Sequence, residues 1–365
     1  MLNRLSLLLL LYLAGTFAWA AAPIITTIAP TSAVVGTVIT ITGTDLEKVT
    51  SVTFNSIATK NITDNTATAL KVTVPEGATS GKLVVTTTGG IVTNSYDFIV
   101  LFGLKINGKD GAEMVWVPGG TFTMGSADGV GETNEHPAHR VTLSGYWIYK
   151  YDITVAQYLA FCAATKHKLP HFPQPMVDYP NVFQSNYSWA GMTGWDNPAL
   201  QQHPIVNVSW NDAKAYTDWA GVTLPTEAQW EYAAYGPQGK YYPWGGIPGD
   251  INNGTDNTKC ANWYNSRDVG KSTWPVGSFP AGSSWCGALD MAGNVWQWCN
   301  DWHGAYTADA VTDPSGPTTG DARVLRGGSW DYGSPRSYSS YRYRCYPDVS
   351  GNVGGFRCAS LAPGP

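Results

Sequence analysis

Charged residues are scarce in this chain of 365 residues: Asp, Glu, Lys and Arg make up 13%, and the formal net charge is -5. Without an excess of basic residues the chain lacks the electrostatic footprint of a nucleic-acid-binding protein, so we expect no nucleic acid partner. Glycine (40), tryptophan (16) and tyrosine (20) are abundant instead. Low charge with many turn-forming and aromatic residues favours a loop-rich globular protein over a helical one.

Long apolar runs are absent after the N-terminus, so no transmembrane segment is expected. At the N-terminus, a basic Arg4 is followed by a largely apolar run over 5–18 and by the small residues of Ala18-Trp19-Ala20. This order predicts a cleavable export signal over residues 1–22. An uncleaved anchor helix is the alternative, but the run is too short to span a bilayer comfortably. We therefore expect an exported protein that is periplasmic, secreted or associated with the cell surface.

Cysteine is absent from the first 160 residues, and no Cys-x-x-Cys pair occurs anywhere in the chain. An even number of cysteines in an exported protein predicts structural disulfides, although six cysteines allow fifteen pairings and the sequence does not choose among them. The six are Cys162, Cys260, Cys286, Cys299, Cys345 and Cys358.

Residues 23–100 contain neither tryptophan nor cysteine, and they alternate Thr and Val between turn-forming residues. Alternation of period two predicts short antiparallel strands in a sandwich. The stretches 25–43 (ITTIAPTSAVVGTVITITG) and 74–86 (VPEGATSGKLVVT) resemble the immunoglobulin-like IPT/TIG family. The resemblance implies a spacer or contact module, and we assign this domain no chemistry.

Residues 101–112 are predicted to be a linker, and residues 113–361 a second domain rich in aromatic residues. Apolar residues at helical spacing predict a helix over Thr154 to Thr165. Ser209 begins a capping signal for a helix that ends near Ala220, and Thr226 begins one for a short helix that ends near Gly236. The rest of this domain is rich in Gly, Pro and Asn, which predicts irregular loops on a small sheet.

The C-terminal stretch 323–357 is rich in tyrosine, serine, glycine, aspartate and arginine. Between its glycine-containing ends, Gly327-Gly328 and Gly355, it lacks Lys, Glu, Gln, Met, Leu and Ile, which is the composition of an antibody-like contact surface. In the alternative, Tyr341 and Tyr343 pack inward on a strand while Arg342 and Arg344 face outward. The predicted ligand-binding residues are Trp330, Asp331, Tyr332, Tyr338, Ser340, Tyr341, Tyr343, Tyr346, Asp348 and Asn352.

Five blocks, in order along the second domain, resemble the formylglycine-generating enzyme (sulfatase-modifying factor) family. The resemblance implies an elaborated C-type-lectin fold. The expected fold class is therefore an all-β immunoglobulin-like sandwich followed by an α+β, loop-rich C-type-lectin-like domain. The blocks are 114–120 (MVWVPGG), 203–210 (HPIVNVSW), 224–233 (LPTEAQWEYA), 290–298 (DMAGNVWQW) and 326–330 (RGGSW) with 355–357 (GFR).

Resemblance to the oxidases of this family implies copper held by two cysteines five residues apart. The corresponding positions here are Pro335 and Ser340. A serine hydroxyl does not replace the soft thiolate that Cu(I) prefers, so we expect no copper and no copper-dependent catalysis. The alternative is an oxidoreductase, formylglycine-generating or non-haem-iron, whose metal ligands are not identified. The histidine pairs His136/His139 and His167/His171 lack a third ligand for such a metal.

The tail also resembles the variable proteins of diversity-generating retroelements, which display a hypervariable ligand-binding surface on this fold. In those proteins, substituted AAC codons never give Lys, Glu, Gln, Trp or Met, and residues 331–355 lack all five. The leading hypothesis is an exported protein whose tail binds a macromolecular partner, a protein or a glycan on a cell or phage surface.

Resemblance to the same enzymes implies two structural calcium sites. Ca²⁺ takes six to eight oxygen ligands, which loops with backbone carbonyls and water provide. The second site lacks a glutamate of the family at Gln297, and turns held by Asx hydrogen bonds are the alternative for both. The first site comprises Asn262, Trp263, Asp268 and Gly270, and the second Gly293, Asn294, Val295 and Gln297.

Overall fold

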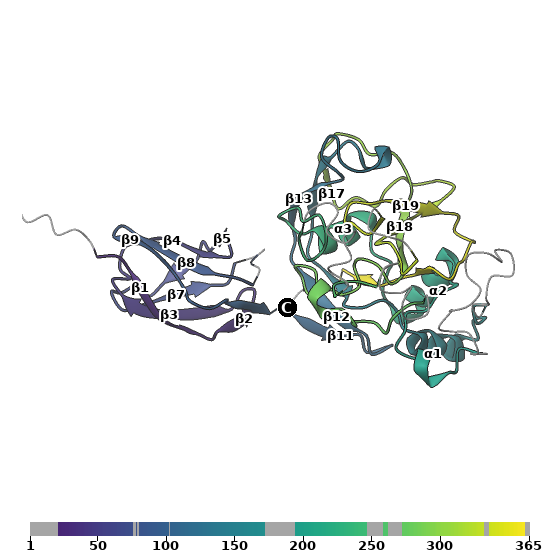
Figure 1. The fold of residues 1–365 in the computed structure, drawn as a ribbon, viewed down its shortest axis with the longest axis horizontal. Coiled ribbons are helices and arrows are strands. Elements are labelled where there is room, and N and C mark those ends of the chain that lie inside the picture. The colour runs from purple at the N-terminus through teal and green to yellow at the C-terminus, as the bar shows by residue number, and fades with distance from the viewer. Residues whose placement is uncertain are drawn as a thin grey trace, which may run out of the picture. The chain divides into compact units, whose positions relative to one another are not determined.

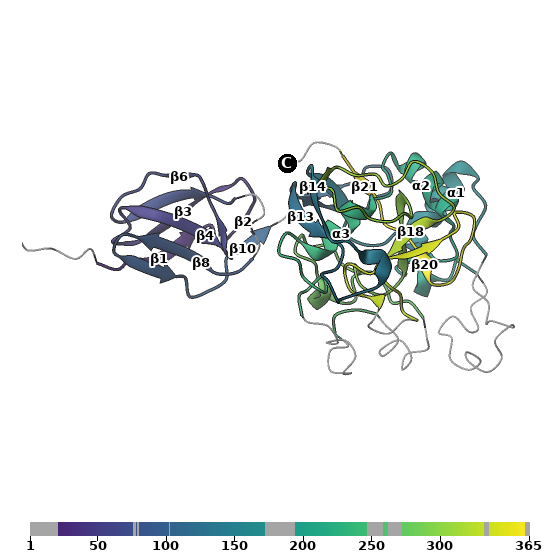
Figure 2. The same ribbon diagram turned by 90° about the horizontal axis from the view of Figure 1, so that it is seen from above.

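The computed structural model describes residues 21–75, 78, 80–101, 103–171, 194–246, 258–261, 272–331 and 336–361 (Figures 1 and 2). The chain divides into two compact units, Met1–Val100 and Leu101–Pro365. The predicted export signal lies almost entirely outside the described residues. Within the described part of the chain, no helix has both the length and the apolar character needed to cross a membrane.

The first unit consists of short antiparallel strands, as the alternation of Thr and Val predicted. In β8 (Leu83–Thr87) every second residue is buried, because successive side chains of a strand point to opposite faces. One sheet has the order β1 (Ile24–Ala29), β3 (Val38–Thr44), β7 (Ala69–Thr73), β6 (Ile62–Thr63). The other has the order β5 (Ile57–Ala58), β4 (Val49–Phe54), β8, β9 (Gly90–Thr93), and β2 (Ser32–Val34) pairs with β10 (Ile99–Leu101).

Three small sheets form the frame of the second unit. The first and last strands of this unit belong to the same sheet, with the order β11 (Leu104–Ile106), β12 (Glu113–Val117), β15 (Tyr146–Tyr149), β21 (Ala359–Ser360). A second sheet has the order β13 (Gly120–Met124), β14 (His139–Leu143), β17 (Val311–Thr312). The third, which carries the tail, has the order β19 (Tyr343–Cys345), β18 (Arg323–Arg326), β16 (Trp296–Trp302), β20 (Gly354–Gly355).

The predicted linker over residues 101–112 is too long. Leu104 pairs with Val115 and Ile106 with Glu113, so β11 is an edge strand of the second unit. The turn between β11 and β12 is closed by hydrogen bonds between Asn107 and Ala112 and between Gly111 and Asn107. Because these contacts are made within the second unit, the boundary lies close to residue 100.

The three predicted helices are confirmed as α1 (Val155–Thr165), α2 (Trp210–Ala220) and α3 (Glu227–Tyr235). Each begins with a reciprocal capping box, in which a Ser or Thr hydroxyl and the side chain three residues later satisfy backbone amides. The pairs are Thr154 with Gln157, Ser209 with Asp212, and Thr226 with Gln229. Short 3-10 turns occur at η1 (Thr133–Glu135), η2 (Pro198–Leu200) and η3 (Pro280–Gly282).

The disulfides predicted from the even cysteine count are not present, since none of the six cysteines is bonded to another. Five of the side chains are buried in hydrophobic packing instead, where a thiol behaves as a small apolar group. Cys162 and Cys358 lie in the cluster around α1 and α2, and Cys286 and Cys299 lie in the cluster around α3. Large aromatic cores, not cross-links, therefore stabilise this domain.

Candidate functional site

The orientation of the tail is set where it joins the sheet. β19 pairs antiparallel with β18, with Tyr343 opposite Leu325 and Cys345 opposite Arg323. Arg342, one residue before the strand, is only 2% exposed, whereas Tyr343 is 40% exposed. Of the two alternatives, the arrangement with Arg342 outward and Tyr343 inward is therefore wrong.

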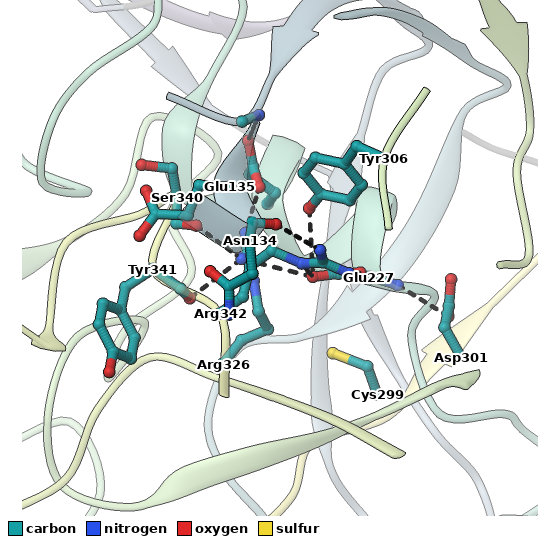
Figure 3. Close-up of polar contacts among 12 residues, drawn as sticks. Asn134, Glu135, Glu227, Cys299, Asp301, Tyr306, Arg326, Ser340, Tyr341 and Arg342 are labelled. Atoms are coloured by element: carbon teal, nitrogen blue, oxygen red, sulfur yellow. Dashed lines mark hydrogen bonds and ion pairs between the residues drawn. The ribbon is translucent and has the colours of Figure 1, made fainter. Parts of the chain in front are cut away.

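Arg342 is held by hydrogen bonds from all three of its guanidinium nitrogens (Figure 3). Its Nε and Nη2 donate to the two carboxylate oxygens of Glu227 at 2.6 and 2.8 Å. Its Nη1 donates to the backbone oxygens of Asn134 and Gly304, and its guanidinium lies 3.8 Å from the centre of the Tyr306 ring. Bidentate pairing with a carboxylate fixes a guanidinium in one plane. The backbone position of Arg342, and with it the start of β19 at Tyr343, is fixed in turn.

A second buried arginine, Arg326, fixes the tail backbone from the adjacent strand. It donates to the backbone oxygens of Ser339, Ser340 and Tyr341, and it forms an ion pair with Glu231. Burial raises the pKa of Glu231 above its usual value, although Arg326 opposes this shift. For Glu227, burial also favours the neutral acid, but Arg342 and Arg326 outweigh it and the pKa is lowered. Glu227 is therefore the ionised centre of this network.

Three of the predicted ligand-binding residues, Trp330, Tyr338 and Ser340, lie in the interior and are not part of the protein surface. The Tyr338 hydroxyl donates to Glu135 at 2.6 Å, and its ring stacks on Tyr241 with centroids 4.9 Å apart. Their role in the structure is to hold the tail in place. Tyr332, another predicted residue, lies outside the described part of the chain.

The remaining predicted residues do reach the surface. Tyr343 is 40% and Tyr346 60% exposed, Asp348 is exposed, and Asp331, Tyr341 and Asn352 are half-buried. We call Tyr343, Tyr346, Asp348 and Asn352 the tail surface.

Beside the tail surface lies a crevice of about 170 Å³. Tyr343 forms one wall and stacks on Trp296, with ring centroids 5.2 Å apart and an interplanar angle of 28°. Cys345 and the exposed Val349 also line the crevice. Sequence reasoning missed Trp296, Cys345 and Val349, because strands distant in sequence bring them together. The crevice is a small apolar hollow next to the polar groups of the tail surface, large enough for one side chain or a ring of a partner rather than for a whole small molecule.

The residues at the position of the family's copper site do not fit Cu(I). Ser340 contributes a hydroxyl that lies 2.8 Å from the hydroxyl of Ser126, which in turn hydrogen-bonds to Glu135. Oxygen donors of this kind are hard, whereas Cu(I) selects soft sulfur. Pro335 lies outside the described residues. In the part of the chain that is described, no three His, Cys, Asp or Glu side chains come together as a metal site.

The histidine pairs make hydrogen bonds within the protein. His136 Nε2 lies 2.9 Å from the Val130 oxygen, and the His139 ring packs against Tyr306. His167 Nε2 lies 2.8 Å from Asp212, at the N-terminus of α2. These contacts favour structural roles for the three rings.

The second predicted calcium site fits the geometry poorly. The Gln297 oxygen already accepts hydrogen bonds from Trp230 Nε1 (2.6 Å) and Arg357 Nε (2.7 Å). The Asn294 amide is paired in both directions with the backbone of Trp274. A cation would have to displace these donors, one of them a guanidinium. The first predicted site, Asn262, Trp263, Asp268 and Gly270, lies outside the described residues.

Comparison with known proteins gives the same domain order as the fold. Residues 104–362 match the family of the sulfatase-modifying factor enzyme 1-like domain, and residues 23–100 match the IPT/TIG domain. The chain belongs to the sulfatase-modifying factor enzyme 1-like family. The predicted fold class, an all-β immunoglobulin-like sandwich followed by an α+β C-type-lectin-like domain, is thereby confirmed.

Relatives of the sulfatase-modifying factor domain include proteins named formylglycine-generating enzyme and a protein named inactive. A formylglycine-generating enzyme of Streptomyces coelicolor is 39% identical, over 68% of this chain and 89% of the relative. A Mus musculus protein named inactive C-alpha-formylglycine-generating enzyme 2 is 31% identical, over 72% of this chain and 90% of the relative. Membership of the family therefore does not by itself establish catalysis.

Solved structures share the fold of the second unit. Treponema denticola variable protein 1 superposes with a TM-score of 0.54 and 22% identity, covering 71% of this chain and 99% of that chain. PvdO from Pseudomonas aeruginosa superposes with a TM-score of 0.54 and 29% identity, covering 70% of this chain and 97% of that chain.

Proposed function

We propose that this protein is exported and binds a macromolecular partner, a protein or a glycan on a cell or phage surface, through the tail surface. The observation that carries the proposal is the outward-facing Tyr343, stacked on Trp296 at the edge of the 170 Å³ crevice. Tyr346, Asp348 and Asn352 add aromatic area and small polar groups around it.

Preorganisation supports this assignment. Arg326 and Arg342 fix residues 339–342 from inside the domain, so the segment that leads into Tyr343 is already held in place before a partner arrives. Tyrosine adds large contact area at the cost of few rotatable bonds, which keeps the entropy loss of binding small. The tail surface is therefore built for contact with little rearrangement.

An oxidoreductase is the second candidate function, because relatives are named formylglycine-generating enzymes. The hydroxyl of Ser340 at the copper position argues against that mechanism. Stoichiometric copper or iron in the purified protein, or oxygen consumption with a cysteine-containing peptide, would favour the enzyme over the binding protein.

Two further proposals concern calcium binding and the origin of the tail sequence. We propose that residues 262–270 bind a structural calcium ion. Calorimetric titration with Ca²⁺, after a chelator has removed bound metal from the protein, would detect it. We also propose that the tail is diversified by a retroelement. A reverse transcriptase gene beside a near-copy of the 3′ end of this gene is expected, and its absence would count against diversification.

A matched tyrosine control makes the binding proposal testable. The full chain is screened on glycan and envelope-protein arrays, and Tyr343→Ala and Tyr346→Ala are then measured on the strongest ligand. Tyr96→Ala is the control, since Tyr96 lies in the first unit and is 39% exposed, close to the 40% of Tyr343. We expect at least one tail variant to weaken binding by about tenfold or more while the control does not. Unchanged affinity in both tail variants would overturn the assignment.

A further inference from the structure

A cavity of about 440 Å³ lies apart from the tail surface, beneath the loop 304–317. We call it the loop cavity. Met124 of β13, His139 of β14 and Tyr306 of the loop form part of its wall, and Glu227 and Asp301 lie at its polar side. A volume of several hundred Å³ with mostly apolar walls and a few polar groups is typical of a small-molecule site.

The loop over this cavity is tied to the domain. Residues Val311 and Thr312 pair with β14 as the strand β17. Asp313 accepts hydrogen bonds from the backbone nitrogen and the hydroxyl of Ser144, at 2.8 and 2.7 Å. The cavity is thus formed in the protein without a ligand, and binding does not require the loop to order.

Of the three buried acidic residues near the loop cavity, Asp301 is the one without an ion pair among the described residues. Glu227 is paired with Arg342 and Glu231 with Arg326. Asp301 is 4% exposed, and within the described residues it forms no ion pair. A buried carboxylate without a counter-ion is costly. In agreement with this, burial and then the charge of Glu227 raise the pKa of Asp301 to about 7.

The positive groups near Asp301 are engaged elsewhere. The charge of Arg342 opposes the rise in the pKa of Asp301, but its guanidinium is paired with Glu227. Arg323 is close, but its guanidinium is sandwiched between Trp210 and Trp302 at 3.8 and 3.5 Å and donates to the Asn300 oxygen. Burial, and then Arg342, lower the pKa of His303 to about 4, so this ring is neutral at pH 7.

Capping of α3 explains only part of what Asp301 does. Its Oδ2 accepts a hydrogen bond from the Glu227 nitrogen at 2.9 Å, at the start of the helix. An asparagine oxygen would accept the same bond, and Thr226 already caps this helix. Capping therefore does not require a charge at this position, whereas recognition of a cation does.

We propose that the loop cavity binds a small ligand that carries a protonated amino group on an apolar body, with Asp301 as its counter-ion. The ammonium would supply the positive charge that the arginines do not provide, and the apolar body would lie against Met124 and Tyr306. An anionic ligand is disfavoured beside Asp301, since the charge of Glu227 is already neutralised by Arg342, which also lines the cavity, and that of Asp301 is not. This inference does not depend on the tail surface.

The probes are benzylamine and benzyl alcohol, which have the same shape and differ in charge. Affinities for the full chain are measured at pH 6 and pH 8, and the ¹³C-methyl signal of Met124 reports whether the probe enters the loop cavity. At pH 8 benzylamine should bind roughly tenfold more tightly than the alcohol, as expected for a charge-assisted hydrogen bond. This preference should shrink at pH 6, where Asp301 becomes protonated.

Asp301→Asn should abolish the preference for the amine, whereas Asp309→Asn should keep it, since Asp309 is an exposed aspartate of the same loop. His139→Gln, which removes the imidazole that lines the cavity, should leave the pH dependence in place. If Asp301→Asn fails to fold, the wild-type preference and the Met124 signal still decide. Equal affinity for the two probes, no binding of either, or an unchanged Met124 signal would overturn the proposal.

Discussion

Arg342 and Glu227 form a fully buried bidentate pair, at 2.6 and 2.8 Å, between residues that are 115 positions apart in the chain. Adjacent residues of an extended chain point to opposite sides. The pair therefore turns Tyr343 toward the solvent and defines which tail residues a partner can reach. The tail surface therefore depends on long-range contacts, this pair and the bonds from Arg326, as well as on its own composition.

Arg342→Ala should destabilise the domain by roughly 3–5 kcal/mol, because it leaves the Glu227 carboxylate buried without its main partner. Urea denaturation measures the loss of unfolding free energy. Arg344→Ala is the matched control: Arg344 is exposed two residues later, and its removal should change stability by less than about 0.5 kcal/mol. Equal effects of the two substitutions would contradict the structural role of the pair.

Tyr338→Phe should cost roughly 1–2 kcal/mol in unfolding free energy, because the hydroxyl that donates to Glu135 is lost in a buried site. Thermal and urea unfolding would detect the change. Tyr346→Phe, which alters a largely exposed ring, should leave stability unchanged. Tyr338→Phe and Tyr346→Phe should each weaken binding of the partner less than Tyr343→Ala does.

Asp301→Asn should raise the melting temperature by roughly 5 °C at pH 8 and have little effect near pH 4. The folded protein holds a proton on Asp301 up to about pH 7, whereas the unfolded chain releases it near the ordinary aspartate pKa of about 4. The unfolding free energy of the wild type therefore falls as the pH rises from about 4 to about 7. Asparagine, which does not ionise, removes this fall. Calorimetry from pH 4 to pH 8 checks the sign. A larger stabilisation at pH 4 than at pH 8 would contradict it.

Copper uptake provides a direct test of the serine at position 340. The wild-type protein should contain no stoichiometric copper after incubation with Cu(I) and gel filtration, because a hydroxyl is a poor ligand for a soft ion. The double substitution Pro335→Cys and Ser340→Cys should restore Cu(I) binding if these positions correspond to the thiolates of the family. Elemental analysis of both proteins gives the answer. Stoichiometric copper in the wild type would favour the oxidoreductase.

Local signals were sufficient for much of the fold. Apolar residues at helical spacing predicted α1, and two capping signals predicted the starts of α2 and α3, because a cap and its partner lie within four residues of each other. Two predictions from local sequence were wrong. The count of cysteines did not reveal that the thiols pack separately in apolar clusters, and the composition of 101–112 did not reveal that Leu104–Ile106 pairs with β12.

The candidate site was only partly visible in the sequence. The tail was identified by its composition, but composition did not separate the buried Tyr338 from the exposed Tyr346. The blocks that contain Glu227 and Arg326 were recognised from their resemblance to a family, and those blocks hold the network that fixes the tail. The crevice and the loop cavity left no local signal.

The sequence by itself determined the order of the domains, the helix starts, the family and the presence of serine where the family's oxidases have a thiolate. Each of these depends on residues that are neighbours in the chain or on the chemical identity of one side chain. Only the tertiary structure decided which tail residues face the solvent and where Asp301 lacks a counter-ion. Those outcomes depend on partners such as Glu227 and Arg342, which become neighbours only when the chain folds.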